Sequence, residues 1–387
     1  MTDNILGVLS DDAFAQRMDT LCAIIAKAGT EEDGLGAGTW KDIQRIVRRG
    51  LAPKLFSVGD QLRCKRGNET LVWDIIGIDH DIPSDKSMTH SMTLQLHDCF
   101  TILRYDTREA LYCAESGLDA GTYNFTVGQH TWNPSEKGKT YQFTLTKPVP
   151  TGGQLVLSAS YSSSLAGTDI MSYTDSFSED AIETVFLAEG NSGTSLGTVN
   201  NTVGGSMNSC QSALLGNNNY AQSSLRQYLG STAVAGSVWT PQNKFDRPPE
   251  WAANTAGFLY GIDENFLAVV GEVDKITVSY GGGSITSSEK IFLLSRSEVY
   301  GGDENGINEG QPYSYYVNNS DLSAAGTAND ANRIKYRDGK VQHWWLRSPG
   351  TDIESYTCYV RYVRNSGDVY NCNSSVYSGV APVCCII

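Results

Sequence analysis

The sequence predicts an α+β protein with a short helical N-terminal region, an all-β middle segment and a mixed C-terminal part. Three observations support this prediction. Apolar residues recur at helical spacing between capping residues near the N-terminus, alternating strand patterns separated by Gly, Pro and Ser clusters fill the middle, and both patterns occur in the C-terminal half. We therefore expect domains at residues 1–104, 105–200 and 201–387.

The N-terminal part shows two helical patterns followed by strand patterns. The first helix is expected from an N-cap at Ser10 to a stop at Gly29, and the second from a cap at Thr39 to a stop at Gly50. The segments LFSVGDQL, LVWDIIGID and SMTLQLHD then alternate or run apolar as strands do.

The rest of the chain alternates between strand and helix patterns. GTYNFTV, TYQFTLTKPVPTGGQLVLSASYS and AIETVFLAEG predict an all-β insert or accessory domain, and the small polar stretch GNSGTSLGTVNNTVGGSMNS predicts a boundary loop. Further on, a helix is expected from a cap at Asn219 to Gly230, and another is capped by Asp263. Strands are expected in KITVSY and IFLLS.

Composition excludes several classes of protein. The chain has 387 residues, 40% of them hydrophobic, which is typical of a folded globular protein. Its net charge of −14 opposes a role in binding nucleic acid, and no apolar run is long enough to span a membrane. The start MTDNILGVLSDDAF lacks the features of a signal peptide, so we expect folding in the cytoplasm. Nine cysteines without a framework spacing indicate reduced thiols.

Two glycine motifs are interpreted as linkers. GTSLG at Gly193 to Gly197 matches the nucleophile-elbow pattern, but that motif needs a strand before Ser195 and a helix after it, and its flanks are small and polar. GLGAG at Gly34 to Gly38 follows an acidic stretch instead of a strand, which does not suit a dinucleotide loop.

No metal site and no cofactor are predicted. The histidines at 80, 90 and 97 and Cys99 do not follow a ligand spacing, so structural histidines are the better interpretation. The loop GGDENGINEG carries calcium-type oxygen donors, but their order differs from an EF-hand and a solvated acidic loop is expected; the donors are Asp303, Asn305, Asn308 and Glu309. Cys384 and Cys385 are expected to be buried as small apolar side chains.

The C-terminal stretch ESYTCYVRYVRNSGDVYNCNSSVYSG is rich in Tyr, Ser and Asn. That composition is typical of recognition surfaces, in which Tyr gives contact area and Ser, Gly and Asn give adaptable hydrogen bonds. It also occurs in sticky, prion-like tracts. The flanks HWWLRSP and GVAPVCCII are apolar, so both ends are expected in a folded domain, with the polar positions between them facing outward.

At these residues the chain resembles a known family. The phrases WWLRSP, NSGDV and GVAP, with VWTPQNKFDRPPEW and IFLLSRSEVYG upstream, are similar to the variable proteins of diversity-generating retroelements, which occur in phages and bacteria, including gut ones. The resemblance implies a C-type-lectin-type C-terminal domain, a fold shared with formylglycine-generating enzymes, and a variable region at about residues 344–387. The calcium-binding motifs of sugar-binding relatives are absent, so sugar specificity does not follow.

The family also implies a mechanism for the unusual composition. Adenines of a template repeat are miscopied, so AAC-type codons reach Tyr, Ser, Asp, Cys, Arg and others, but not Lys, Gln, Glu, Met or Trp. Between Gly350 and Ser378 there is no Lys, Gln, Met or Trp, and Glu354 is the only Glu. The ligand-binding positions that the resemblance implies are Asp352, Ser355, Tyr356, Cys358, Tyr359, Arg361, Tyr362, Arg364, Tyr370, Cys372, Asn373, Ser374, Tyr377 and Ser378.

We therefore expect a non-enzymatic protein that binds a protein or glycan ligand and is displayed on a virion or bacterial cell surface. A homo-oligomer would present several ligand-binding sites at once, which would raise the avidity of sites that are individually weak. Two alternatives stay open at this point. The chain could be a structural virion component whose Tyr-rich tail packs on a neighbouring subunit, or an oxidase of the formylglycine-generating type, for which only Cys384 and Cys385 offer a local cysteine pair.

Overall fold

The computed structural model describes residues 37–107, 111–112, 117–127, 138–150, 154–157, 183–185, 188–199, 218–242, 248–278, 283–317, 328–350 and 359–387. These residues form an α+β architecture with many strands and few, short helices, as the sequence predicts. Within these ranges, no helix has the length and apolar character needed to cross a membrane.

The chain forms two compact units that do not follow the three expected consecutive segments. Unit 1 comprises residues 1–97, 261–273 and 384–387, and unit 2 comprises residues 98–260 and 274–383. The C-terminal part of the sequence therefore contributes to both units.

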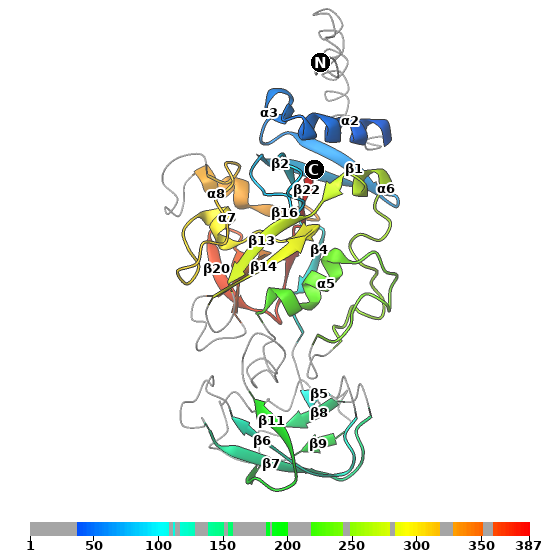
Figure 1. Ribbon diagram of the computed structural model, residues 1–387, viewed down its shortest axis with the longest axis vertical. Coiled ribbons are helices and arrows are strands. Elements are labelled where there is room, and N and C mark those ends of the chain that lie inside the picture. The colour runs from blue at the N-terminus through cyan, green and yellow to red at the C-terminus, as the bar shows by residue number, and fades with distance from the viewer. Residues whose placement is uncertain are drawn as a thin grey trace, which may run out of the picture. The chain divides into compact units, whose positions relative to one another are not determined.

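Unit 1 is built on a sheet that combines strands from the first hundred residues with the last strand of the chain. Its strand order is β1 (Gln61–Arg66), β2 (Glu69–Ile78), β3 (Met92–Leu96), β22 (Val383–Ile386) and β12 (Val270–Gly271). β1 and β2 form an antiparallel hairpin whose turn includes Gly67, with a φ of 57°. β22 lies between β3 and β12, so strands about 290 residues apart in sequence are neighbours (Figure 1).

Helix α2 (Ala37–Arg48) packs its apolar face into unit 1. Trp40, Ile43 and Val47 are buried, and the Trp40 ring lies 4.7 Å from that of Phe266 on α6 (Glu264–Leu267). The shorter helix α3 (Ala52–Leu55) follows. Burial of this apolar face is the main source of stability for a helix of this length.

The N-terminal predictions are correct in part. Helix α2 begins at Ala37, so Thr39 lies inside it and is not its N-cap, whereas Gly50, with a φ of 64°, follows its end as expected. LFSVGDQL is not one strand, because Asp60 N donates to Ser57 O in a turn (3.0 Å) and β1 begins only at Gln61. The helix predicted from Ser10 to Gly29 lies outside the described residues.

Unit 2 contains the sheet that carries the C-terminal tail. Its strand order is β20 (Val369–Asn373), β19 (Tyr359–Val363), β18 (Trp344–Pro349), β21 (Tyr377–Val380) and β4 (Thr101–Arg104). Figure 1 labels the two edge strands, β20 and β4. β18 and β21 are parallel, and the other neighbours are antiparallel. The Trp345 Nε1 group donates to Leu103 O at 2.9 Å, so the central tryptophan is buried with its polar atom bonded.

Short helices and hairpins complete this part of unit 2. The helices are η3 (Tyr220–Gln222), α5 (Ser224–Gly230), α7 (Arg296–Tyr300) and α8 (Ala328–Arg333), and the further strands are β13 (Val273–Val278), β14 (Ser284–Glu289), β15 (Ile291–Phe292), β16 (Lys335–Arg337) and β17 (Lys340–Gln342).

The helix caps match the sequence prediction in some places and refine it in others. The Asn219 side chain accepts from Ala221 N at 3.1 Å, but it caps the turn η3, and Ser223 caps α5. Asp263 caps α6 as predicted, although the helix ends at Leu267 and the chain continues into β12. The sequence prediction missed α7, which begins with a capping box of Ser295 and Glu298.

The described residues from 111 to 199 form two small β-sheets. One has the order β10 (Ala188–Glu189), β7 (Thr140–Leu145), β6 (Gly121–Val127) and β11 (Thr194–Val199), and the other β5 (Leu111–Tyr112), β8 (Gln154–Leu157) and β9 (Glu183–Val185). Cross-strand pairs on one face of β6 and β7 are aromatic, such as Tyr123 with Phe143, and on the other polar, such as Thr122 with Thr144.

The predicted boundary loop is partly wrong. Ser195 lies within β11, which pairs with β6 in parallel, so the GTSLG segment is a strand and not a linker. Residues 200–217, where a nucleophile elbow requires a helix, lie outside the described residues.

Candidate ligand-binding face

Ten of the fourteen candidate ligand-binding positions lie in the described residues. Asp352, Ser355, Tyr356 and Cys358 lie outside them. The other ten fall on or beside strands β19, β20 and β21 of the unit 2 sheet; they are Tyr359, Arg361, Tyr362, Arg364, Tyr370, Cys372, Asn373, Ser374, Tyr377 and Ser378.

Tyr362 and Tyr370 form the centre of the candidate face. They are directly opposite each other in the antiparallel pair β19 and β20, so their side chains share one side of the sheet. Cys372, two residues along β20, lies on the same side and is half-buried. Tyr370 is 55% exposed, which gives a ligand access to an aromatic ring on a strand.

The hairpin turn between the two strands fixes a cation above Tyr370. Arg364 N donates to Asp368 O at 2.8 Å, and Gly367, with a φ of 87°, closes the turn. The Arg364 guanidinium lies 4.7 Å from the Tyr370 ring centroid and also pairs with the Asp368 carboxylate, with Nε to Oδ2 at 2.9 Å. Ring and guanidinium therefore form one exposed pair on a rigid hairpin.

The Tyr362 ring packs against two other rings, those of Trp345 and His343. It lies 6.2 Å from that of Trp345 and 5.7 Å from that of His343, both in edge-on contacts. Partial burial raises the pKa of Tyr362 further above neutral pH, and its protonated hydroxyl can donate a hydrogen bond.

Tyr377 on β21 is a second exposed aromatic position. Its side chain is 47% exposed, and the Arg104 guanidinium lies 4.8 Å from its ring centroid. Arg104 in turn pairs with Glu250 at 2.5 Å. This repeats the arrangement of Arg364 and Tyr370, with an exposed tyrosine stacked on an arginine that a carboxylate orients.

Three candidate positions do not face solvent, which corrects the expectation that they are displayed. Arg361 is 9% exposed and forms a bidentate ion pair with Glu304, with both N–O distances at 2.8 Å. Ser374 is buried, and its carbonyl accepts from Tyr105 N at 2.9 Å. Ser378 is buried, with its hydroxyl donating to His343 O at 3.1 Å. Arg361 therefore holds β19 in place and does not offer its charge to a ligand.

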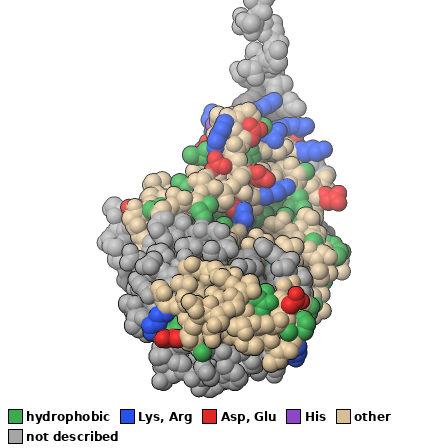
Figure 2. Space-filling view, turned by 60° about the horizontal axis from the view of Figure 1, so that its bottom comes forward, with side chains coloured by type: hydrophobic (Ala, Val, Ile, Leu, Met, Phe, Trp, Pro, Cys, Tyr) green, Lys and Arg blue, Asp and Glu red, His purple; other side chains and the backbone are tan. Residues whose placement is uncertain are grey.

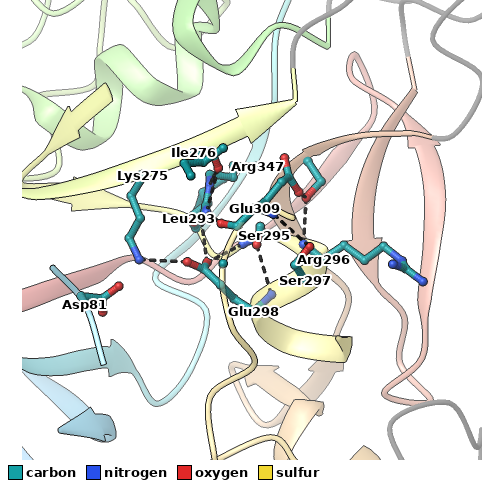
Figure 3. Close-up of polar contacts among 12 residues, drawn as sticks. Asp81, Lys275, Ile276, Leu293, Ser295, Arg296, Ser297, Glu298, Glu309 and Arg347 are labelled. Atoms are coloured by element: carbon teal, nitrogen blue, oxygen red, sulfur yellow. Dashed lines mark hydrogen bonds and ion pairs between the residues drawn. The ribbon is translucent and has the colours of Figure 1, made fainter. Parts of the chain in front are cut away.

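A buried ionic network lies beneath the sheet at Arg347 of β18 (Figure 3). Arg347 Nη1 donates to Glu298 Oε2 at 2.5 Å and to Leu293 O at 2.9 Å. The other Glu298 oxygen accepts from Lys275 Nζ at 2.9 Å. Burial alone would lower the pKa of Arg347, but the carboxylates of Glu298 and Glu309 raise it above its ordinary value. The cations and the carboxylate are thus satisfied by one another, as buried charges require.

The acidic loop of residues 301–310 is solvated in part, as expected: Asp303, Asn305 and Asn308 are exposed, whereas its two glutamates face inward. Glu304 and Glu309 are both buried. Glu309 accepts from Val278 N at 2.8 Å and from the hydroxyl of Ser348, and its carbonyl accepts from Arg347 Nη2 at 2.8 Å. Burial raises the pKa of Glu309 to about 7.

The two glutamates hold both strand ends that flank residues 351–358. Glu304 binds Arg361 near the start of β19, and Glu309 binds Ser348 near the end of β18. Four of the candidate positions lie between these two anchor points in sequence. The loop therefore preorganises the supports of the candidate face. The sequence prediction missed this network, although the Ser-x-x-Glu pattern at 295–298 and an arginine within the apolar WWLRSP run were visible signals.

Two of the histidines singled out from sequence each pair with a different carboxylate. His97 Nδ1 lies 2.9 Å from Asp74 Oδ2, and His90 Nδ1 lies 3.1 Å from Asp79 Oδ1. Among the residues that the structure describes, no group of three or more His, Cys, Asp and Glu side chains is placed to hold a metal ion. Cys384 and Cys385 are fully buried in β22, which confirms the expectation for this pair.

One protein-family model matches the C-terminal half of the chain. Residues 197–387 match a protein family described as a domain of unknown function (DUF6273). No curated protein and no solved structure matches the chain. The matched region contains β18 to β22 and the loop with Glu304 and Glu309, and so includes the whole candidate face apart from β4.

Proposed function

We propose that this chain is a non-enzymatic ligand-binding protein whose C-terminal, C-type-lectin-type face is diversified by adenine-directed mutagenesis of a retroelement. The ligand is a protein or glycan on a target surface, and the protein is displayed on a virion or bacterial cell surface. The observation that carries the proposal is the coincidence of two features: a segment with the restricted alphabet of miscopied adenines supplies Tyr370 and Tyr377, which are the exposed tyrosines of the sheet.

The geometry supports recognition by aromatic anchors. Tyr362, Tyr370 and Tyr377 lie on strands of a rigid sheet, and arginines stack on the last two. Tyrosines on a rigid support lose little conformational entropy on binding and are enriched among the residues that dominate binding energy. The buried network beneath them restrains the support, which lowers the cost of ordering the face on association.

The burial of the C-terminal cysteine pair favours this proposal over an oxidase. A reactive cysteine acts as a thiolate in a partly exposed, electropositive setting, whereas Cys384 and Cys385 have no exposed surface. If the chain were instead a structural virion component, the exposed tyrosines would be covered by a neighbouring subunit. Measurements of stability and assembly distinguish this alternative from ligand binding.

A binding experiment tests the proposal. Labelled full-length protein is applied to arrays of glycans and of bacterial surface proteins, beside a Tyr362→Ser/Tyr370→Ser variant and a Tyr260→Ser control. Tyr260 is 48% exposed and lies outside the candidate face, so it matches Tyr370 in exposure. We expect the double variant to lose at least about tenfold in affinity, as for two anchor residues of an interface, and the control to bind as the wild type does. Equal binding by all three proteins would place the ligand site elsewhere.

A further inference from the structure

Unit 1 carries a concentration of positive charge in an otherwise acidic chain. Residues 40–67 contain eight Lys and Arg and two Asp, a net charge of +6 in a chain of net charge −14, so the remaining residues carry −20. In Figure 2, blue Lys and Arg side chains outnumber the red Asp and Glu side chains that lie among them in the upper part of the view. Such asymmetry is typical of a surface that binds an anionic partner.

The cations form an ordered row on the outward side of α2. At 100° per residue, Lys41, Arg45 and Arg48 fall within an arc of about 60°, opposite the buried Trp40, Ile43 and Val47, and Arg49 follows in the turn after the helix. All four cations are exposed, as is Lys54 of α3. We name these five residues the cationic face.

Few of these charges are neutralised within the protein. Arg45 pairs with Asp42 at 2.6 Å, and Arg48 Nε donates to Ile387 O at 3.2 Å. In the part of the chain that the structure describes, no carboxylate forms an ion pair with Lys41, Arg49 or Lys54. Three exposed cations are therefore available to a partner.

We propose that the cationic face docks on an acidic surface patch of another protein. The face is local, and the chain outside residues 40–67 is strongly acidic. A duplex nucleic acid or a charged bilayer extends its negative charge well beyond the roughly 8 Å range of electrostatic interaction in physiological salt, and would be repelled by the exposed carboxylates elsewhere in unit 1, such as Glu69, Asp85 and Glu272. A folded protein with a patch of similar size matches the cations without that repulsion, and arginine suits its carboxylates because the guanidinium binds them bidentately.

Insertion into a membrane is not compatible with this helix. An interfacial helix needs an apolar face for the lipid, whereas the apolar face of α2 is used in the core of unit 1, where the Trp40 and Phe266 rings are in contact. The proposal does not depend on the ligand-binding face, because every residue of the cationic face belongs to unit 1 and every described candidate ligand-binding residue to unit 2.

The test compares three anionic probes on the full-length protein. A fluorescent polyglutamate peptide represents a carboxylate surface, a mixed-sequence DNA duplex represents nucleic acid, and phosphatidylserine vesicles represent a membrane. The variant Lys41→Gln/Arg49→Gln/Lys54→Gln removes the three available cations. The matched control Lys147→Gln/Lys290→Gln/Lys340→Gln removes three solvent-accessible cations outside unit 1.

We expect polyglutamate to bind the wild type and the control at low ionic strength, to bind the cationic-face variant about tenfold more weakly, and to dissociate as salt is added. Equal binding by the two variants, or no binding to the wild type, would overturn the proposal. Tighter binding of the duplex or the vesicles than of polyglutamate would overturn the choice of a protein partner.

Discussion

Arg361 of β19 and Glu304 form a bidentate ion pair with two N–O distances of 2.8 Å, although position 361 lies inside the segment proposed to be diversified. Both groups are almost completely buried. The pair joins the acidic loop of residues 301–310 to a strand of the candidate face, so the face depends on a charge that a ligand does not reach.

Replacing Arg361 should therefore destabilise the fold. Arg361→Ser leaves the buried Glu304 carboxylate without its bidentate partner, and we expect a loss of about 3–5 kcal/mol in the free energy of unfolding. Urea denaturation measures the effect. Arg364→Ser is the matched control, because Arg364 also pairs with a carboxylate but is exposed, and it should cost about 0–1 kcal/mol. Equal losses in the two variants would show that the Glu304 pair does not support the fold.

The exposed tyrosines should contribute little to folding. We expect Tyr370→Ser/Tyr377→Ser to change the free energy of unfolding by no more than about 1 kcal/mol, because the two side chains are 55% and 47% exposed. Trp345→Ala, which removes a fully buried ring, should cost about 3–5 kcal/mol. Denaturation and subunit mass by light scattering are the measurements. A large loss of stability or of assembly in the tyrosine variant would favour the structural interpretation of the tail.

Glu309 predicts a pH dependence of stability. Its pKa is raised by burial to about 7 in the folded protein and is near 4.5 when unfolded, so the folded state binds more protons in this window. The contribution of Glu309 should therefore lower the free energy of unfolding by about 3 kcal/mol as the pH rises from about 4.5 to 7.

The variant Glu309→Gln isolates that contribution. Glutamine resembles the protonated carboxyl, so the variant should be more stable than the wild type at pH 7.5 and should lose this advantage towards pH 5. Urea denaturation of both proteins at the two pH values gives the difference. A difference that does not change with pH would mean that Glu309 does not titrate in this range.

Thiol labelling should distinguish the half-buried cysteine from the buried ones. In a background with Ser at positions 22, 113, 210 and 358, Cys372 should react with a maleimide in the native protein, although burial raises its pKa and slows the reaction. Cys64 and Cys99, whose pKa values burial raises to about 12, should react only after unfolding. The fully buried Cys384 and Cys385 should do the same. Peptide mass spectrometry assigns the sites, and rapid native labelling of Cys384 or Cys385 would revive the oxidase hypothesis.

Local patterns in the sequence predicted part of the local structure, although they misplaced the start of α2 and missed α7. Asp263 caps a helix, Gly50 follows the end of another, and Cys384 and Cys385 are buried, because caps, positive φ angles and apolar runs depend on nearby residues. Long-range partners were not visible. Arg361 and Ser374 have the residue types of a surface, and only Glu304 and Tyr105, distant in sequence, place them in the interior. The pairing of β22 with β3 likewise depends on a contact between residues about 290 positions apart.

Deep sequencing of this gene across a population of its host element tests the central claim most directly, with the neighbouring DNA examined for a near-identical repeat. The account predicts substitutions concentrated at the exposed candidate positions, including Tyr370 and Tyr377, at codons where the repeat has adenines. It also predicts that Arg361 is retained, because Glu304 needs its charge. An invariant tail with no repeat nearby would contradict the proposed diversification.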